Sequence, residues 1–550
     1  MTGAQYIVES LIRHGVNDAF GVPGGVILGL LYEMENHKPE FIPHLSYHEQ
    51  CAGFAACGYA QASGKIGVAY ATRGPGFTNL ITAIAEAYYD SLSTLFITAH
   101  SDSIPIGQMR VMSDQEMDTC SMVRNITKMA VRIDDKNVFC ETIDKAIAVA
   151  LDGRKGPVLL DISSQLFSND VPIKVKRNVY LKKEDYSKYI NEIESAIRNA
   201  KRPIILAGDG INQVNTKDAF RKLIKRIKIP VISSRFSHDV MAGQDNYYGY
   251  IGSHGMRCAN FILSKTDLIL SLGNRLHFPP KSKSYNSVMN HAKLLRVEID
   301  ENEFNRTIQN SINYRCELKE LINQSVALMG DCGNHDEWIK ICDTLKNELK
   351  TEDIVPVIDS IMSILHKIDK KMIVVSDVGN NEFWLSRAAV ESNCRNRVMY
   401  SKSFGAMGCG LGKAIGAYYG SHKPVVCVVG DQGLQLNIQE LQYISQYRLP
   451  ISIVLLNNKT SGMIKDRELS CYHIPLHTTK ESGYETPDFK AIAQAYGIKV
   501  AGQVSCYEPI FMEIDVNPDL SLSPVLPRGE KCQDMLPKLP IEKYRYLNSL

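Results

Sequence analysis

Short apolar runs rich in β-branched residues recur along the chain, and several of them end at a glycine. They lie at residues 68–71, 95–98, 203–207, 267–273, 424–429 and 451–456. Longer stretches of mixed polarity, such as Tyr189–Asn199, separate these runs and have the length of helices. Strands that alternate with helices are typical of parallel sheets whose two faces are covered by helices. The pattern therefore predicts an α/β protein.

The alternating pattern falls into three blocks. A chain of 550 residues exceeds what a single hydrophobic core usually serves, so several domains are expected. We expect three doubly wound parallel-sheet domains at residues 1–170, 188–330 and 350–515, the second of them Rossmann-like. The charged stretch Lys174–Lys188 is the expected linker before the second domain. A C-terminal tail rich in Pro, Leu and Lys follows at 516–550.

Composition and charge argue against several classes of function. Hydrophobic residues make up 44% and charged residues 22% of the chain, as in ordinary globular proteins, and the net charge of +2 favours neither nucleic acid nor a membrane surface as a partner. No apolar run reaches the length of a membrane-spanning helix, and no signal pattern opens the chain. The 14 cysteines include no CxxC pair, which argues against a zinc site or a disulfide framework and suggests a reducing cytoplasm.

Two segments of the third block place oxygen ligands at the ends of predicted strands. Residues 430–433 (Gly-Asp-Gln-Gly) follow one strand and Asn457-Asn458 follow the next, so that Asn458 lies 27 residues after Asp431. We expect a helix between them, from Leu436 to Tyr447. Because the carboxyl ends of parallel strands meet at one edge of a sheet, these oxygens would lie together, where they suit Mg²⁺ or Ca²⁺. The N–H groups of the neighbouring helix N-terminus suit a phosphate that also binds the cation. The alternative is an ordinary loop, since Gly-Asp-x-Gly alone is a common turn.

The first block holds a second group of candidate residues. Glu49 begins a helix made largely of Ala, Gly and Cys, which allows another surface to approach closely. For a lone glutamate, the usual explanation is a favourable interaction with the helix dipole. Further along, Gly74-Pro75-Gly76 forms a turn that opens a helix containing Asn79, and Gln115-Glu116 come later.

Taken together, these segments resemble the thiamine diphosphate (ThDP)-dependent enzymes of the acetolactate synthase (acetohydroxyacid synthase) group over nearly the whole chain. Residues 430–458 resemble the family's GDG–NN motif, 73–79 its SGPG-x-x-N segment, 377–384 its DVGQHQMW segment and 405–408 its GAMG segment. The resemblance implies a pyrimidine-binding first domain, a central domain and a diphosphate-binding third domain. It also implies ThDP and Mg²⁺ as cofactors.

The resemblance assigns roles to individual residues. Glu49 and Gln115 are implied to be catalytic, with Glu49 contacting the aminopyrimidine of the cofactor. Asp431, Asn458 and the backbone carbonyl of Thr460 are implied to ligate Mg²⁺. The implied cofactor contacts are Gly24, Gly25, Asn79, Asn380, Asn381, Gly405, Met407, Gln432, Gly433 and Met463.

Three of these positions depart from the family pattern. Asn380 and Asn381 stand where the family has Gln and His, and they are shorter polar groups that still suit a phosphate oxygen. Gln432 stands where the family has glycine, so its side chain would crowd the diphosphate if that position requires a positive φ.

The implied reaction is decarboxylation of a 2-keto acid, with pyruvate as the default donor, and carboligation to a 2-keto acid, aldehyde or keto-sugar. In the family, active sites lie between the subunits of a homodimer or homotetramer. The alternatives are a non-ligating decarboxylase and an FAD-dependent oxidoreductase similar to pyruvate oxidase. No adjacent pair of histidines occurs in the first domain, which favours carboligation over simple decarboxylation. A non-catalytic member is a further alternative, disfavoured because Glu49, Met407, Asp431 and Asn458 are all retained.

The acceptor and flavin regions match the family poorly. Arg467 stands where the family has Trp, and residues 275–279 replace its Arg-Phe-Asp-Asp-Arg segment. These departures argue against FAD and against acetolactate as the product, whereas residues 208–210 and 253–255 resemble flavin-contacting positions.

Four basic residues would suit an acceptor that carries a phosphate, a carboxylate or many hydroxyls, provided that they face the cleft: Arg73, His277, Lys465 and Arg467. The alternative is that these basic side chains simply reach solvent.

Overall fold

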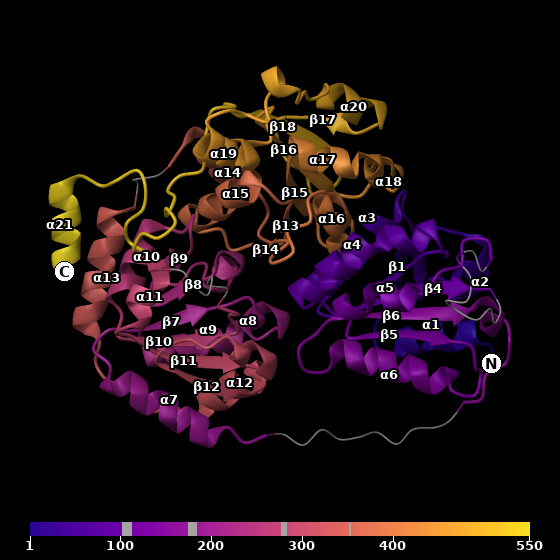
Figure 1. Ribbon diagram of the computed structural model, residues 1–550, viewed down its shortest axis with the longest axis horizontal. Helices are drawn as coiled ribbons and strands as arrows, with labels where there is room; N and C mark the ends of the chain where they lie inside the picture. Colours follow the sequence, from indigo (N-terminus) through magenta and orange to yellow (C-terminus); the bar gives the residue numbers. More distant parts are fainter. Residues whose placement is uncertain (102–109, 111–112, 174–183, 277–282, 351–353) are drawn as a thin grey trace. The chain divides into compact units, whose positions relative to one another are not determined.

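Three six-stranded parallel sheets flanked by helices make up the computed structural model, which describes residues 1–101, 110, 113–173, 184–276, 283–350 and 354–550 (Figure 1). This confirms the predicted fold class. Most of the predicted linker Lys174–Lys188 lies outside the described residues. The chain divides into two units, one formed by Met1–Val179, Ile368–Glu382 and Asn396–Leu520, the other by Tyr180–Lys367, Phe383–Arg395 and Ser521–Leu550.

The N-terminal sheet of the first unit has the order β2-β1-β3-β4-β6-β5. Its strands are β1 Asp18–Gly21, β2 Ile42–Leu45, β3 Gly67–Tyr70, β4 Thr94–His100, β5 Met129–Ile133 and β6 Pro157–Ser163. Its helices are α1 Gly3–Arg13, α2 Leu28–Asn36, α3 Glu49–Ser63, α4 Pro75–Asp90, α5 Thr119–Val123 and α6 Phe139–Leu151. The strand order reverses between β1 and β3, and the carboxyl edge at such a reversal is where open α/β sheets commonly bind ligands.

The second sheet of the first unit has the order β14-β13-β15-β16-β18-β17 and reverses between β13 and β15. Its strands are β13 Ile373–Ser376, β14 Arg397–Met399, β15 Val425–Gly430, β16 Ile451–Asn457, β17 Lys499–Val500 and β18 Ile510–Asp515. Its helices are α15 Asn380–Glu391, which continues into the second unit, α16 Cys409–Ser421, α17 Asp431–Leu436, α18 Leu441–Gln446, α19 Gly462–Tyr472 and α20 Phe489–Ala495. The segments after β13, β15 and β16 carry the motifs of the third block.

The helix expected from Leu436 to Tyr447 is broken, and that prediction was wrong in detail. The helix α17 already starts at Asp431 and ends at Leu436, and α18 begins only at Leu441. Asn437 leaves the helical conformation, with φ −138° and ψ 33°, and its side-chain amide donates to the Gly408 carbonyl over 2.9 Å. A tertiary hydrogen bond thus outweighs local helix propensity at this position.

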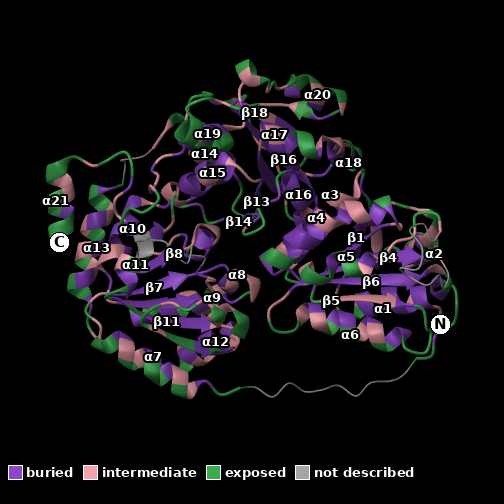
Figure 2. Cartoon of the chain, viewed as in Figure 1, coloured by how far each residue is buried: buried purple, intermediate pink, exposed green. Residues whose placement is uncertain are grey.

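The helices α3 and α16 pack against each other and join the two sheets of the first unit into one hydrophobic cluster (Figure 2). Both helices are rich in small buried residues, as the sequence of the segment after Glu49 predicts. A β-carbon added at Gly416 would lie 1.8 Å from the Ala55 carbonyl oxygen, and one at Gly58 would lie 2.3 Å from the Lys413 carbonyl oxygen. Glycine is therefore required for this close approach of the two backbones.

The second unit contains a sheet of order β12-β11-β10-β7-β8-β9. Its strands are β7 Pro203–Ala207, β8 Val231–Ser233, β9 Tyr247–Tyr250, β10 Leu268–Leu272, β11 Lys293–Glu298 and β12 Ser311–Arg315. Its helices are α7 Ser187–Asn199, α8 Gly210–Gln213, α9 Lys217–Ile227, α10 Arg257–Lys265, α11 Lys283–Met289, α12 Leu318–Leu328, α13 Asp336–Glu348 and α14 Pro356–Lys367.

The C-terminal tail packs onto the second unit and ends in the helix α21, Ile541–Ser549. Arg257 donates to the carbonyls of Met535 and Pro537, and Cys532 and Leu547 are fully buried. The hydrogen bonds of Arg257 and the buried side chains of Cys532 and Leu547 thus anchor the tail. No helix of the described residues is long and apolar enough to cross a membrane.

Candidate active site

The carboxyl edge of the N-terminal sheet carries Glu49 and its partner Asn79. Glu49 is the first residue of α3, where the His48 side chain caps the helix by accepting from the Gln50 N–H. Asn79 lies in the first turns of α4, and its side-chain amide donates to Glu49 Oε2 over 2.9 Å. The structure thus places the two candidate residues in direct contact and fixes one oxygen of the carboxylate.

The other candidate residues at the carboxyl edge of the N-terminal sheet lie on neighbouring loops. Gly24 follows β1, where a β-carbon would lie only 2.4 Å from that of Thr72, and Gly25 begins a short 3₁₀ turn. Gln115 is exposed, adopts a φ of 59° and lies against Gly74, where a β-carbon would meet its own at 2.7 Å. Gly24, Gln115 and the α4 turn therefore line the same edge of the sheet.

Arg73, which stands where the family has serine, is held within the chain. Its guanidinium forms an ion pair of 2.5 Å with Glu116 and also bonds to the hydroxyl of Ser101. Glu116 accepts in addition from the Ser101 N–H over 2.8 Å. The positive charge of Arg73 is thus neutralised locally, which argues against its use as an acceptor-binding cation.

The candidate metal ligands lie at the ends of β15 and β16. Asp431, Asn458 and Thr460 are 4%, 6% and 5% exposed, and Asn458 donates to the Thr460 hydroxyl over 3.0 Å. Asp431 Oδ1 accepts from the Gln432 N–H, whereas Oδ2 has no hydrogen-bond partner among the described residues. Burial raises the pKa of Asp431 to about 6, although hydrogen bonds lower it in part. A buried carboxylate with one unpaired oxygen suits a cation.

The two asparagines at the start of α15 behave differently. Neither the carbonyl oxygen nor the amide nitrogen of Asn380 has a hydrogen-bond partner among the described residues, although the side chain is buried. A β-carbon at Gly462 would lie 2.6 Å from the Asn458 amide nitrogen and 2.8 Å from that of Asn380, so both amides converge there. Asn381 instead donates to the Asp377 carbonyl over 2.8 Å. Asn380 is therefore the more available of the two.

Gln432 fits the loop without backbone strain. It lies in the first turn of α17 and is not among the described residues with positive φ. Its side-chain oxygen accepts from the Ser461 hydroxyl over 3.2 Å and so links the loops after β15 and β16. Gly433 packs beside the Asp377 carboxylate. The conformational penalty considered for Gln432 therefore does not arise.

The segment 405–408 is held by the buried carboxylate of Asp377. Asp377 accepts from the N–H groups of Gly408 and Gly410 over 3.0 and 2.9 Å, and burial raises its pKa. Gly405 adopts a φ of 71°, which suits glycine. Met407 and Met463 are each 36% exposed, unusually accessible for such apolar side chains. Both are therefore available to a ligand.

A residue that the sequence did not single out links the start of α3 to the part of the chain that follows β15. Glu440 is fully buried and accepts from the N–H groups of Tyr47 and His48 over 2.9 and 3.1 Å. Burial raises its pKa to about 7, against the lowering effect of these hydrogen bonds. Asn437 adds a bond to Gln50, beside Glu49. The structure thus brings the end of α3 that carries Glu49 next to the segment around Gly408.

Comparison with known proteins decides the family. Three family models match the chain: the N-terminal TPP binding domain of thiamine pyrophosphate enzymes at residues 1–122, their central domain at 190–325 and their C-terminal TPP binding domain at 377–514. The acetolactate synthase large subunit of Lactococcus lactis subsp. lactis is 30% identical over 97% of this chain and 96% of its own. The acetolactate synthase isozyme 2 large subunit of Escherichia coli is 29% identical over 98% of this chain and 100% of its own. This chain belongs to the acetolactate synthase-like family of ThDP-dependent enzymes.

The buried polar atoms of this acetolactate synthase-like enzyme fit a diphosphate and a cation. Asn380 and one oxygen of Asp431 lack partners within the described part of the chain, and the hydroxyl of Tyr484 lies beside the Asp431 carboxylate, whose pKa it lowers in part. Such groups are costly to bury unless something pairs with them. The described residues contain no group of three or more His, Cys, Asp or Glu able to hold a metal. A cation at Asp431 would therefore depend on amide, carbonyl and phosphate oxygens, as Mg²⁺ commonly does.

The flavin-like positions of the second unit are explained by packing. A β-carbon at Gly208 would lie 2.1 Å from the Gly273 carbonyl oxygen, so this glycine serves the contact between two loops. The ring of His254 lies 4.8 Å from that of Phe383, and burial lowers its pKa to about 4. Of the segment 275–279, the residues from His277 onward lie outside the described residues. These positions thus carry no argument for FAD.

Proposed function

We propose that this enzyme decarboxylates a 2-keto acid, with pyruvate as the first candidate, and joins the product to a carbonyl acceptor. The proposal rests chiefly on one observation. Glu49 with Asn79 lies at one carboxyl edge of the first unit, and the unpaired atoms of Asn380 and Asp431 lie at another. The proposed cofactors are ThDP and Mg²⁺, and ThDP when bound supplies the electron sink for the charge left by departing CO₂.

The proposed role of Glu49 is to exchange a proton with the aminopyrimidine of the cofactor. The amide of Asn79 would hold the carboxylate in one orientation, because it occupies Oε2 and leaves Oε1 for the ring. Gln115, on the loop against Gly74, would contact substrate. General acid–base help of this kind contributes roughly 10²–10⁴-fold to a rate.

The proposed diphosphate and metal contacts come from the loops after three neighbouring strands. Asp431, Asn458 and the Thr460 carbonyl would ligate Mg²⁺, and Asn380 would donate to a phosphate oxygen. Gly433 and the side chain of Gln432 would lie beside the diphosphate, while Asn381 would act mainly by fixing the loop after β13. Gly405, Met407 and Met463 would contact the organic part of the cofactor.

For the acceptor, Arg467 is the basic residue best supported as a contact. Arg73 is paired with Glu116, and Lys465 is buried and bonds to the Pro518 carbonyl. Arg467 is exposed on α19, one turn beyond Met463 and therefore on the same face of that helix. We therefore propose an acceptor with an anionic group, which a second 2-keto acid satisfies.

The proposed assembly is a homodimer, or a pair of homodimers, with the active site completed by residues of two subunits. Within one chain the surfaces of α3 and α16 already meet, and Asn437 links Gln50 to Gly408, so the proposal of a shared site rests on the family resemblance. Whether one chain or two supply these surfaces is tested by complementation, as set out in the Discussion.

The test is to incubate the purified enzyme with pyruvate, ThDP and Mg²⁺, without FAD, and to identify products by mass spectrometry. Acetolactate or acetoin would support carboligation. Acetaldehyde alone would identify a non-ligating decarboxylase, and acetate formed only after FAD is added would identify an oxidoreductase. If pyruvate is not consumed, even with aldehyde and keto-sugar acceptors present, pyruvate is not the donor; if other 2-keto acids are not consumed either, the proposed reaction is wrong.

A further inference from the structure

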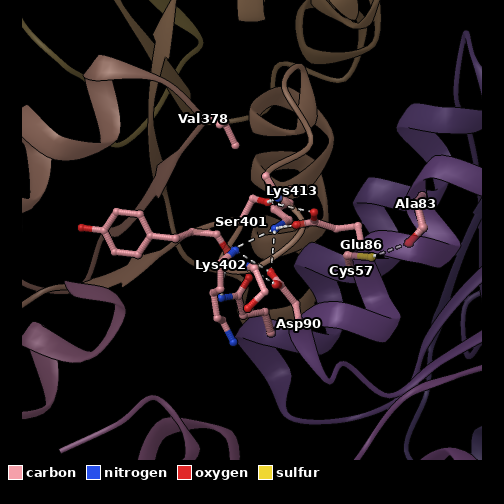
Figure 3. A network of polar contacts seen from close by, with 12 residues as sticks. Cys57, Ala83, Glu86, Asp90, Val378, Ser401, Lys402 and Lys413 are labelled. Atoms are coloured by element: carbon pink, nitrogen blue, oxygen red, sulfur yellow. Dashed lines mark hydrogen bonds and ion pairs between the residues drawn. The ribbon is translucent and has the colours of Figure 1, made fainter. Parts of the chain in front are cut away.

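A fully buried cluster of charges lies where α4 meets α16 in the first unit (Figure 3). Lys413 of α16 forms an ion pair with Glu86 of α4 and lies 3.8 Å from Asp90, also of α4. Its ammonium group donates in addition to the Tyr400 carbonyl over 3.1 Å. These three charged side chains are at most 1% exposed, so none of their interactions is weakened by solvent.

The two acids of this cluster hold the backbone of the loop that follows β14. Asp90 accepts from the N–H groups of Lys402 and Ser403, each over 2.8 Å. Glu86 accepts from the hydroxyl of Ser401 over 2.8 Å. Together with the bond from Lys413 to the Tyr400 carbonyl, the cluster contacts four consecutive residues.

One further hydrogen bond connects this loop to residues 405–408, which are assigned above to the cofactor. The Ser401 hydroxyl, which donates to Glu86, accepts from the N–H of Gly405 over 3.1 Å. Gly405 has a φ of 71° and begins the segment that leads to Met407. The position of its peptide therefore depends on the orientation of one buried hydroxyl, which Glu86 fixes.

A purely structural role explains this arrangement poorly. Buried ion pairs are often no more stabilising than well-packed apolar residues, because desolvation offsets the attraction. Burial raises the pKa of Glu86 to about 7 even though Lys413 lowers it, which reflects this cost. Apolar side chains could join α4 to α16, but they could not bind the N–H groups of the loop.

We propose that Glu86, Asp90 and Lys413 are positioning residues that hold Gly405 and Met407 in the geometry required for ThDP binding, with Ser401 as the connecting group. The inference rests on the proposed function, because Gly405 and Met407 are assigned there to the cofactor. It adds residues that do not touch the cofactor and that the motifs do not include.

The first test is Ser401→Ala, which removes the link between Glu86 and Gly405 while leaving the ion pair intact. Titration calorimetry with ThDP at saturating Mg²⁺ should show about tenfold weaker binding, the effect of losing one buried hydrogen bond. The matched control is Ser452→Ala, on β16 of the sheet whose strand β14 precedes Ser401. The Ser452 hydroxyl is also buried and bonds to the backbone of Ser505, but at the amino-terminal end of β16. The control should bind ThDP as the wild type does.

The second test is Asp90→Asn, which replaces one of the two acceptor oxygens with an amide that cannot accept from a backbone N–H. Its affinity for ThDP should fall by at least as much as that of Ser401→Ala. Apparent Tm, measured without ThDP, separates positioning from general destabilisation. We expect the Tm of Ser401→Ala to stay close to that of Ser452→Ala while their affinities for ThDP differ.

The outcomes separate this inference from the proposed function. If the wild type does not bind ThDP, the proposed function is wrong and the inference falls with it. If the wild type binds but Ser401→Ala and Asp90→Asn bind equally well, only the positioning role is refuted. Equal losses of affinity in Ser401→Ala and Ser452→Ala would also refute it, because they would indicate a nonspecific effect.

Discussion

The close packing of α3 on α16 predicts a sharp effect for the substitution Gly416→Ala. An added β-carbon would lie 1.8 Å from the Ala55 carbonyl oxygen, whereas such contacts are essentially never shorter than 3.0 Å. The two backbones must therefore separate by roughly 1.2 Å, the difference between these two distances. Overpacking of this kind typically costs about 1–3 kcal/mol. A displacement of about 1 Å between reacting groups can lower a rate by roughly 10²-fold. We expect kcat to fall to that extent, because α3 carries Glu49 and α16 follows the Gly405–Gly408 segment.

The assay is the steady-state rate of pyruvate consumption at saturating ThDP and Mg²⁺, with thermal unfolding measured on the same samples. Gly420→Ala should have a milder effect, since its β-carbon would lie 2.8 Å from the Tyr59 carbonyl oxygen. Gly502→Ala is the control, because no atom lies within 4 Å of the added carbon. Wild-type kcat and Tm in Gly416→Ala would show that the two helices accommodate the added β-carbon without moving apart, and the reasoning would be wrong.

Three further predictions concern the site and its supports. Glu49→Gln should lower kcat by roughly 10²–10⁴-fold while calorimetry shows that ThDP still binds, and undiminished turnover would refute its catalytic role. Glu440 has a raised folded-state pKa of about 7, so its stabilising contribution is complete below about pH 4.5 and is lost as the pH rises through 7. Glu440→Gln should therefore remove up to roughly 3 kcal/mol of the pH dependence of the free energy of unfolding. An unchanged pH profile would contradict the raised pKa of Glu440. Co-expressed Glu49→Gln and Asp431→Asn chains should recover about a quarter of wild-type activity if two subunits share each site, whereas no recovery would indicate that each chain supplies its own site.

The sequence predicted the fold because the strands that carry the motifs are continuous apolar runs. The predicted runs 203–207 and 451–456 coincide with β7 and β16 within one residue. Asp431 and Asn458 could be placed because each directly follows such a strand, and parallel strands end at one edge of their sheet. The break of the helix at Asn437 was not predictable, since it depends on a hydrogen bond to Gly408, which is distant in sequence.

The sequence did not predict the roles of Glu440 and of the Lys413–Glu86 pair, for the same physical reason. Glu440 binds backbone groups of residues almost four hundred positions earlier, and Lys413 pairs with Glu86 across a similar distance in sequence. One local signal was available. Lys413 and Glu86 are charged residues within helices otherwise rich in small and apolar residues, and such residues are rarely buried without a partner. The identity of that partner becomes evident only from the tertiary structure.

The measurement that tests the account most directly is the release of ¹³CO₂ from [1-¹³C]pyruvate by the purified wild-type enzyme, followed by mass spectrometry with and without ThDP and Mg²⁺ and always without FAD. The account predicts release that requires both cofactors, that is abolished by EDTA and that is accompanied by a ligated product. Release that is unaffected by omission of ThDP, or none at all in its presence, would contradict the assignment of Glu49, Asn380 and Asp431 to a ThDP site.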